Sequence, residues 1–151
     1  MNSKLKKIVG LLCMAHFTFL SAQSFDFVID HSAIIVNQLE KTGDFYAKVM
    51  GLQEIPHPTN SPGFRWFNVQ GNSQLHLIYK DTVVMKKHKS MHLCLSTQKL
   101  DAFIENLKYH QIPFEDWPGK PNAVTLRADG VQQIYIQDPE GYWIEINDAA
   151  H

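Results

Sequence analysis

The sequence predicts an α+β fold in which two βαβββ modules form a curved mixed sheet around a shared cavity. The order of expected strands and helices in the first half of the chain is repeated in the second half. Four polar residues stand at matching positions of the two halves, in strands that are otherwise largely apolar. The 151 residues, 44% of them apolar, are enough for one globular domain with its own hydrophobic core.

The first 22 residues have the pattern of a secretory signal peptide. Three lysines form a positive start, and a mainly apolar stretch follows from residue 8 to residue 20. The small residues Ser21 and Ala22 then offer a cleavage site. We therefore expect an exported protein, periplasmic or secreted, that is cleaved near Ala22 and keeps no stable membrane anchor. An uncleaved N-terminal anchor is the alternative interpretation.

Composition narrows the possible classes of partner. The formal net charge is −1, and no basic patch is interleaved with aromatic residues, so nucleic acid is not an expected partner. Cleavage near Ala22 leaves Cys94 as the only cysteine of the mature chain, which excludes an internal disulfide. An exported domain of this size must then be stabilised by its core, or by its core and a bound metal.

The first module is expected at residues 25–80 of a domain that spans residues 25–148. It begins with a strand at 25–36, and a helix follows at 38–50, with Asn37 placed to cap its start. Gly43 should weaken this helix by about 1 kcal/mol relative to alanine. Three further strands complete the module, at 53–55, 64–69 and 74–79.

The second module, residues 89–148, repeats this order. A strand at 91–96 precedes a helix that Thr97 is placed to cap and that runs to residue 109. The module closes in a hairpin around the turn Asp138-Pro139-Glu140-Gly141, because proline presets φ and glycine accepts a conformation that other residues resist. Its remaining strands are expected at 112–114, 124–127, 133–137 and 143–147.

Four polar residues occupy two pairs of equivalent positions. His31 and His92 lie in the first strand of each module, and His76 and Glu145 lie in the last strand. Strand alternation turns each of His76, His92 and Glu145 away from its apolar neighbours, which suit the face covered by the helices. A carboxylate such as Glu145 in the middle of an apolar strand is costly to bury unless it is paired or binds a metal.

Three imidazoles and a carboxylate that converge in one cavity suit a first-row divalent metal ion, such as zinc, nickel, cobalt, iron or manganese. A single histidine in a strand is more often a hydrogen-bonded core residue. Four candidates at equivalent positions favour a metal site made of His31, His76, His92 and Glu145. His76 is alternatively a pocket residue or a proton-transfer group.

The residues named above lie in motifs that resemble the vicinal oxygen chelate superfamily. This superfamily includes glyoxalase I, fosfomycin resistance proteins, methylmalonyl-CoA epimerase and the extradiol dioxygenases. The resemblance covers residues 27–147 and is carried by the segments IDHSAIIV, FYAKVMGL, QLHLIY, MHLCLS and DPEGYWIEI. It implies the duplicated fold described above, with a shared metal-binding cavity whose ligands come from the first and last strands of each module.

Carried over residue by residue, the resemblance implies His31, His76, His92 and Glu145 as metal ligands. His76 is a departure, because bacterial glyoxalase I resembles this chain elsewhere but has glutamate at that position, and the epimerases have glutamine. In glyoxalase I the metal-bound glutamates are implicated in moving the substrate proton. The resemblance therefore implies Glu145 and His76 as the candidate catalytic residues.

The resemblance implies a metal-dependent lyase or isomerase of glyoxalase-like type. Its substrate would be a small carbonyl or hydroxy compound that chelates the metal through two neighbouring oxygens, with Trp66, Trp117 and Trp143 as pocket walls or as ordinary core residues. Export disfavours a glutathione adduct as the substrate, since glutathione is chiefly cytosolic. The alternatives are an extradiol-type dioxygenase, with two histidines and Glu145 around iron, and a bleomycin-resistance-like binding protein. The modules pair either within one chain or between two chains of a homodimer.

Overall fold

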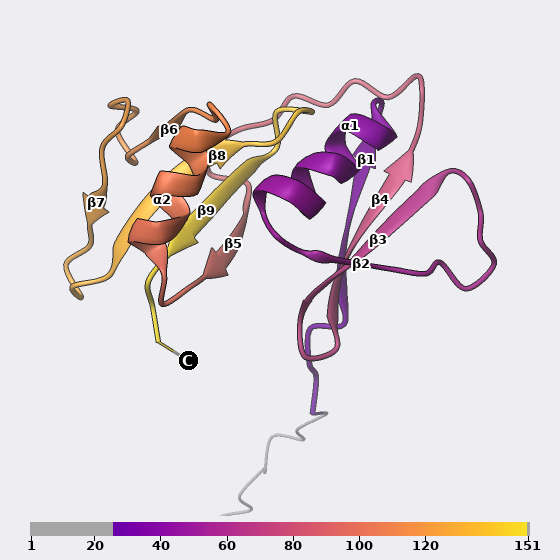
Figure 1. Cartoon of the computed structure of the whole chain (residues 1–151), viewed down its shortest axis with the longest axis horizontal. Helices are drawn as coiled ribbons and strands as arrows, with labels where there is room; N and C mark the ends of the chain where they lie inside the picture. The colour runs from indigo at the N-terminus through magenta and orange to yellow at the C-terminus, as the bar shows by residue number, and fades with distance from the viewer. Residues whose placement is uncertain (1–25, 151) are drawn as a thin grey trace, which may run out of the picture.

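A computed structural model describes residues 26–150, and its mixed α+β architecture confirms the predicted fold class. One sheet has the strand order β1 (His31–Val36), β4 (Ser73–Tyr79), β3 (Phe64–Gln70) and β2 (Gln53–Ile55) (Figure 1). The other has the order β5 (His92–Ser96), β9 (Trp143–Asn147), β8 (Gln132–Gln137) and β6 (Phe114–Glu115), with β7 (Thr125–Leu126) beside β8. The predicted signal peptide, residues 1–22, lies outside the described residues. Within residues 26–150, no helix is long and apolar enough to cross a membrane.

The first module follows the predicted element order, with two differences in detail. The first strand begins at His31 rather than at residue 25, because its parallel pairing with β4 starts at Gln74, near the beginning of that strand. The predicted single helix is a short α-helix that continues as a π-helix, η1, and ends before Gly51 (φ 68°). The elements are β1 (His31–Val36), α1 (Leu39–Asp44), η1 (Phe45–Val49), β2 (Gln53–Ile55), β3 (Phe64–Gln70) and β4 (Ser73–Tyr79).

The second module repeats the pattern with one additional strand. Two short strands, β6 and β7, both pair with β8 and together take the place of the single edge strand β2 of the first module. The first and last strands of this module, β5 and β9, are parallel neighbours, as β1 and β4 are in the first. The elements are β5 (His92–Ser96), α2 (Leu100–Tyr109), β6 (Phe114–Glu115), β7 (Thr125–Leu126), β8 (Gln132–Gln137) and β9 (Trp143–Asn147).

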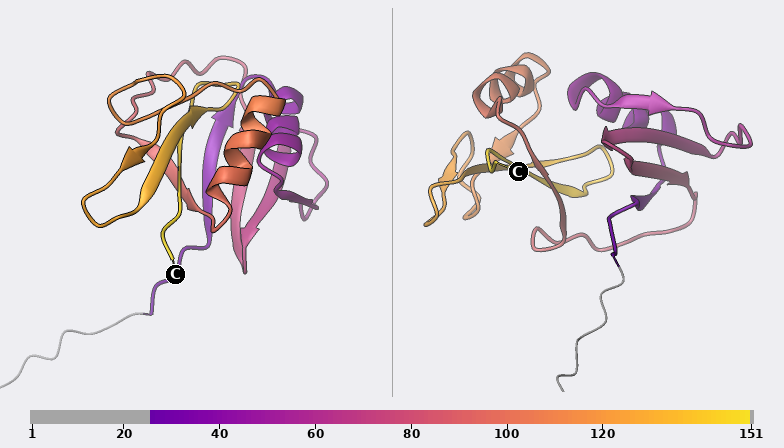
Figure 2. Two further views of the ribbon diagram at one scale, coloured as in Figure 1. Left: turned by 60° about the vertical axis from the view of Figure 1, so that its left-hand side comes forward. Right: turned by 90° about the horizontal axis from the view of Figure 1, so that it is seen from below.

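One hydrophobic core joins the two modules. Both helices lie on the same side of the two sheets, as Figure 2 shows. The side chains that the sheets turn toward the helices form a single buried cluster with residues of α1, η1 and α2. This cluster includes Phe67, Leu75 and Leu77 of the first sheet, and Ile134, Ile144 and Ile146 of the second.

The turn of the closing hairpin binds the start of the helix in the other module. Oε1 of Glu140 accepts hydrogen bonds from the backbone N–H groups of Asn37 (2.9 Å) and Gln38 (2.6 Å). Gln38 is the N-cap residue of α1, and its own side chain makes no capping bond. The expectation that Asn37 caps the helix is therefore wrong. The carboxylate of Glu140, 102 residues after Gln38, caps the helix instead, at the end where negative charge is favourable.

Asp138 and Tyr142 hold this turn in place. Oδ1 of Asp138 accepts backbone hydrogen bonds from Glu140 (2.9 Å) and Tyr142 (2.8 Å), and its Oδ2 accepts a bond from the hydroxyl of Tyr46 (3.1 Å). The hydroxyl of Tyr142 donates to the backbone oxygen of Ile35 (3.0 Å). Tyr46 and Ile35 belong to the first module, so the turn connects the modules by several directional bonds.

Gly43 lies where a neighbouring side chain packs closely against the helix. The guanidinium of Arg65 lies against the glycine, and a Cβ built at Gly43 would stand 2.3 Å from Cζ of Arg65. Arg65 donates two hydrogen bonds to the carboxylate of Glu54 (2.8 and 2.7 Å) and one to Asp44 (3.2 Å). A side chain at position 43 would therefore have to displace the Arg65 guanidinium from its place in this ion-pair cluster.

Replacing Glu140 by glutamine should lower the free energy of unfolding by about 1–2 kcal/mol, because charge-assisted hydrogen bonds to two backbone amides become neutral ones. Urea unfolding of the purified protein measures the change. Glu105→Gln, on the exposed face of α2, is the matched control and should change the same quantity by less than about 0.5 kcal/mol. Equal unfolding free energies for the two variants would contradict the capping role of Glu140.

Candidate metal centre

The first module brings His31 and His76 together. They lie on the neighbouring parallel strands β1 and β4, and their rings are stacked with centroids 4.3 Å apart. Nδ1 of His31 lies 2.6 Å from Oδ2 of Asp30, so its Nε2 is left available. A carboxylate on the second ring nitrogen is the usual way in which proteins orient a metal-binding histidine.

His76 is enclosed by aromatic rings on both sides. Its second face is covered by Trp66, whose ring is parallel to it to within 5° at a centroid distance of 3.8 Å. The residue is 8% exposed, and burial together with the nearby His31 lowers the pKa of its imidazole. The neutral ring that results is the form that binds a metal or accepts a proton. Nε2 of His76 lies 2.8 Å from Oε1 of Gln74, which leaves Nδ1 as the unengaged nitrogen.

The second module brings His92 and Glu145 together. They lie on the parallel neighbours β5 and β9, and Nε2 of His92 is 3.3 Å from Oε2 of Glu145. Nδ1 of His92 donates to the backbone oxygen of Lys89 (2.7 Å), because a carbonyl can only accept. This bond orients the ring of His92 as Asp30 orients that of His31, with Nε2 facing Oε2 of Glu145.

A network of donors holds Glu145 as a carboxylate. The side chain is 6% exposed, and its Oε2 accepts a hydrogen bond from the hydroxyl of Tyr135 (2.6 Å). Its Oε1 accepts bonds from Asn147 (2.9 Å) and from the thiol of Cys94 (3.4 Å). Burial raises the pKa of the carboxyl group, but the hydrogen bonds from Tyr135 and Asn147 outweigh it, and the resulting pKa lies below the usual value. An ionised Glu145 is a suitable metal ligand.

The donors themselves stay protonated. Burial raises the pKa of the Tyr135 hydroxyl, and the hydrogen bond to Glu145 raises it further. Burial likewise raises the pKa of the Cys94 thiol to about 11, with the charge of Glu145 as the next cause. Cys94 therefore acts as a weak hydrogen-bond donor rather than as a nucleophile.

The His31–His76 pair and the His92–Glu145 pair do not come together within one chain. Among residues 26–150, no group of three or more His, Cys, Asp or Glu side chains is close enough to hold a metal ion. Strand alternation explains which faces they occupy, since His76 and Glu145 alternate with core residues that turn toward the helices. Each module thus presents a two-ligand half-site on the sheet face away from the common core: His31 with His76, and His92 with Glu145.

The ligand chemistry of both half-sites fits a first-row divalent metal. Nε2 of His31 and Nδ1 of His76 are free of the partners that hold the other ring nitrogen, Nε2 of His92 faces Glu145, and the carboxylate of Glu145 is ionised. Three nitrogens and one oxygen are a donor set that zinc, nickel, cobalt, iron and manganese accept. The half-sites contain all four residues that the sequence pattern singled out.

The three tryptophans lie close to the half-sites. Trp66 stacks on His76, and Trp143 is the direct strand neighbour of His92. Trp117 lies 5.4 Å from the ring of Tyr135, and Nζ of Lys89 lies 4.8 Å from the ring of Trp143. Trp66 and Trp143 thus adjoin predicted ligands directly, and Trp117 adjoins Tyr135, which donates to Glu145.

Sequence reasoning missed the supporting residues of Glu145. Tyr135 is its direct neighbour across the β8–β9 hairpin, and Asn147 follows two residues later on the same face. Both could have been found by pairing the two strands outward from the Asp138–Gly141 turn. Lys89 could not, because it acts on His92 through its backbone oxygen, which carries no signal in the side-chain pattern.

Comparison with known proteins places these features in a family. The model of the glyoxalase/bleomycin resistance protein/dioxygenase superfamily matches residues 28–146. The chain is 25% identical over 135 residues to the mitochondrial methylmalonyl-CoA epimerase of Homo sapiens, an alignment that covers 80% of this chain and 73% of the epimerase. It is 23% identical over 154 residues to the lactoylglutathione lyase of Pseudomonas putida, covering 80% and 84%.

Solved structures share the fold. A glyoxalase family protein from Bacillus anthracis superposes with a TM-score of 0.69 at 24% identity, over 85% of this chain and all of the other. Because the family model covers most of the chain and the architecture is the same, the protein belongs to the glyoxalase/bleomycin resistance protein/dioxygenase superfamily.

Proposed function

We propose that the protein is a metal-dependent lyase or isomerase that acts on a small carbonyl or hydroxy compound with two neighbouring oxygens. The observation that carries the proposal is the pair of oriented half-sites, each of which supplies two ligands on a ligand-facing sheet surface. The similarity to a lactoylglutathione lyase and to an epimerase supports the same reaction class. Both names denote enzymes that rearrange or cleave a substrate without a net oxidation.

The complete site would form between two chains. One chain holds its two ligand pairs apart, and a symmetric dimer brings the same surface of two copies together. His31 and His76 of one copy would then complete a site with His92 and Glu145 of the second copy. A dimer contains two such sites, related by the twofold axis.

A divalent ion held there would polarise a substrate oxygen and stabilise the anion that forms when a proton is removed. Glu145 is the candidate base, because it is ionised and Tyr135 and Asn147 fix its orientation. His76 is a second candidate, because its ring is neutral and is held flat between Trp66 and His31. Either group would have to lie within hydrogen-bond reach of the proton that it takes.

Export remains part of the proposal. The first 22 residues carry the signal-peptide pattern, so the enzyme would work outside the cytosol on a substrate other than a glutathione adduct. N-terminal sequencing of the protein recovered from the periplasm or medium tests this, with a first residue near Gln23 expected.

Metal binding is expected to depend on Glu145. Titration of the chelator-treated protein with Co²⁺, followed by visible absorption, should reveal a saturable site. Glu145→Gln should weaken Co²⁺ binding by at least the roughly 10–100-fold that loss of an outer-shell partner already costs. His110→Ala, at the end of α2 and outside both half-sites, is the control and should bind as the wild type does. Absence of a saturable site in the wild type would refute the metal centre.

Sharing of the site between chains predicts complementation. A variant with His31→Ala and His76→Ala, and a second with His92→Ala and Glu145→Ala, should each lose Co²⁺ binding. Refolding the two as a mixture should restore about a quarter of the wild-type sites, because half of the dimers are mixed and each of these has one intact site. A site within one chain would give no recovery at all.

The reaction class can be tested directly. Turnover of a hemithioacetal or a chiral α-hydroxy carbonyl compound without oxygen is expected, and Glu145→Gln should lower kcat by about 10²–10⁴-fold if the residue moves the proton. Oxygen uptake with catechols, measured on the iron-loaded protein, would instead establish an extradiol-type dioxygenase. Tight binding of small molecules without turnover of either kind would point to a binding protein.

A further inference from the structure

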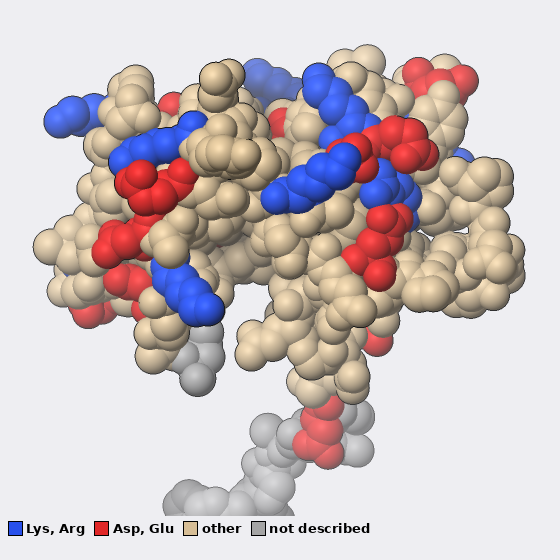
Figure 3. All heavy atoms as spheres, in the orientation of Figure 1, with Lys and Arg blue, Asp and Glu red and all other residues tan. Residues whose placement is uncertain are grey.

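A cleft separates the two modules at the end of the molecule where β1 and β4 begin and where β5 and β9 end. Its volume is about 420 Å³, and Figure 3 shows the surface hollowed between the two halves of the chain. None of the four predicted metal ligands lines it. The cleft is therefore a different place from either half-site.

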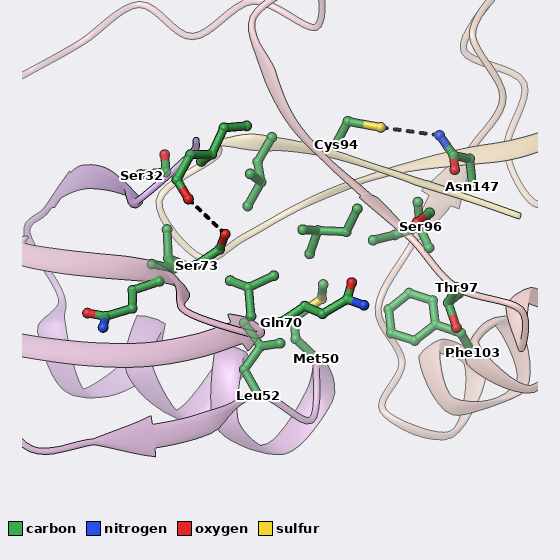
Figure 4. A pocket seen from close by; sticks show the side chains of 17 residues that line it. Ser32, Met50, Leu52, Gln70, Ser73, Cys94, Ser96, Thr97, Phe103 and Asn147 are labelled. Carbon is green, nitrogen blue, oxygen red and sulfur yellow. Dashed lines mark hydrogen bonds between the residues drawn. The ribbon is translucent and has the colours of Figure 1, made fainter. Parts of the chain in front are cut away.

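Apolar side chains of both modules form most of the cleft wall. The first module contributes residues that follow η1 and residues of β3 and β4, and the second contributes residues from β5, α2 and β9 (Figure 4). Two of them, Leu75 and Ile146, also belong to the common core and are 1% and 3% exposed. The main apolar residues are Met50, Leu52, Leu75, Leu93, Phe103 and Ile146.

The polar groups of the cleft are hydroxyls, amides and the thiol of Cys94. Ser32, Ser96 and Thr97 contribute hydroxyl groups, and Gln74 and Asn147 contribute amides. All 17 lining residues drawn in Figure 4 are uncharged, so the wall contains no Asp, Glu, Lys, Arg or His. A charged ligand would lose its hydration here without gaining a counter-charge.

We propose that this cleft binds an uncharged, largely apolar small molecule that carries one or two hydrogen-bonding groups. Its volume lies in the range of about 300–1,000 Å³ that is typical of small-molecule sites, which are mostly apolar with a few polar groups for orientation. Its wall is made by 17 residues, fewer than the roughly 20–30 residues per partner of a stable protein–protein interface. These properties favour a small molecule over a second copy of the chain as the occupant.

The cleft also contacts both half-sites through its wall. Gln74 lies 2.8 Å from the imidazole of His76, and the amide of Asn147 donates to Glu145 at 2.9 Å. A molecule in the cleft would therefore share two of its polar contacts with predicted metal ligands. Binding in the cleft does not require a metal, because none of the four predicted metal ligands lines it.

The test uses N-phenyl-1-naphthylamine, an uncharged apolar fluorophore, with the purified protein in the presence of EDTA. The fluorescence should rise to saturation with a single class of site. Ser32→Trp and Ser96→Trp should each weaken binding by about tenfold or more, because the indole fills the cleft from opposite modules. Ser90→Trp, in the exposed segment before β5 and outside the cleft lining, is the matched control and should leave the affinity unchanged.

An anionic counterpart, 8-anilinonaphthalene-1-sulfonate, distinguishes the ligand class and should bind more weakly than the uncharged probe. Equal or tighter binding of the anion would overturn the proposal, as would saturable binding of the neutral probe that neither filling variant reduces. Light scattering of the same samples provides the remaining outcome. If the filling variants dissociate a dimer and leave probe affinity unchanged, a second copy occupies the cleft and the proposal is wrong. Because EDTA is present throughout, failure of this test leaves the metal-centre experiments unaffected.

Discussion

The hydrophobic core shared by the two sheets determines which side chains of this protein are available for chemistry. Successive residues of a strand point to opposite faces, so every leucine or isoleucine that enters the core turns its neighbours to the other side. Leu75 and Leu77 do this for His76, and Ile144 and Ile146 do it for Glu145. The polar half-sites are consequently a product of the same packing that stabilises the fold, and a slip of one residue in either strand would bury the wrong set.

Much of this arrangement could be predicted from the sequence. The duplicated element order, the closing hairpin and the face on which each predicted ligand lies all depend on local patterns, and the strand Trp143–Asn147 agrees with prediction to the residue. Relations between distant residues could not be predicted. Glu140 meets Asn37 across about a hundred residues of chain, and the guanidinium of Arg65, from a different element, occupies the space beside Gly43. Propensity describes a residue in its own segment and carries no information about such partners.

The separation of the two ligand pairs is a related case. Equivalent positions in a duplicated chain predict a pseudo-twofold arrangement of ligands, but they do not specify which two modules form it. That choice depends on how the helix faces pack, which is a property of the folded core. The support around Glu145 shows the same limit: a buried carboxylate requires partners, and only strand register identifies them as Tyr135 and Asn147.

The contact between Glu140 and the start of α1 also orders events during synthesis. Domains that fold as they leave the ribosome generally do so from the N-terminus, one unit at a time. Here the first module emerges before the carboxylate that completes its helix, because Glu140 follows Gln38 by 102 residues. An N-terminal half emerging alone has an uncapped helix and an uncovered apolar helix face.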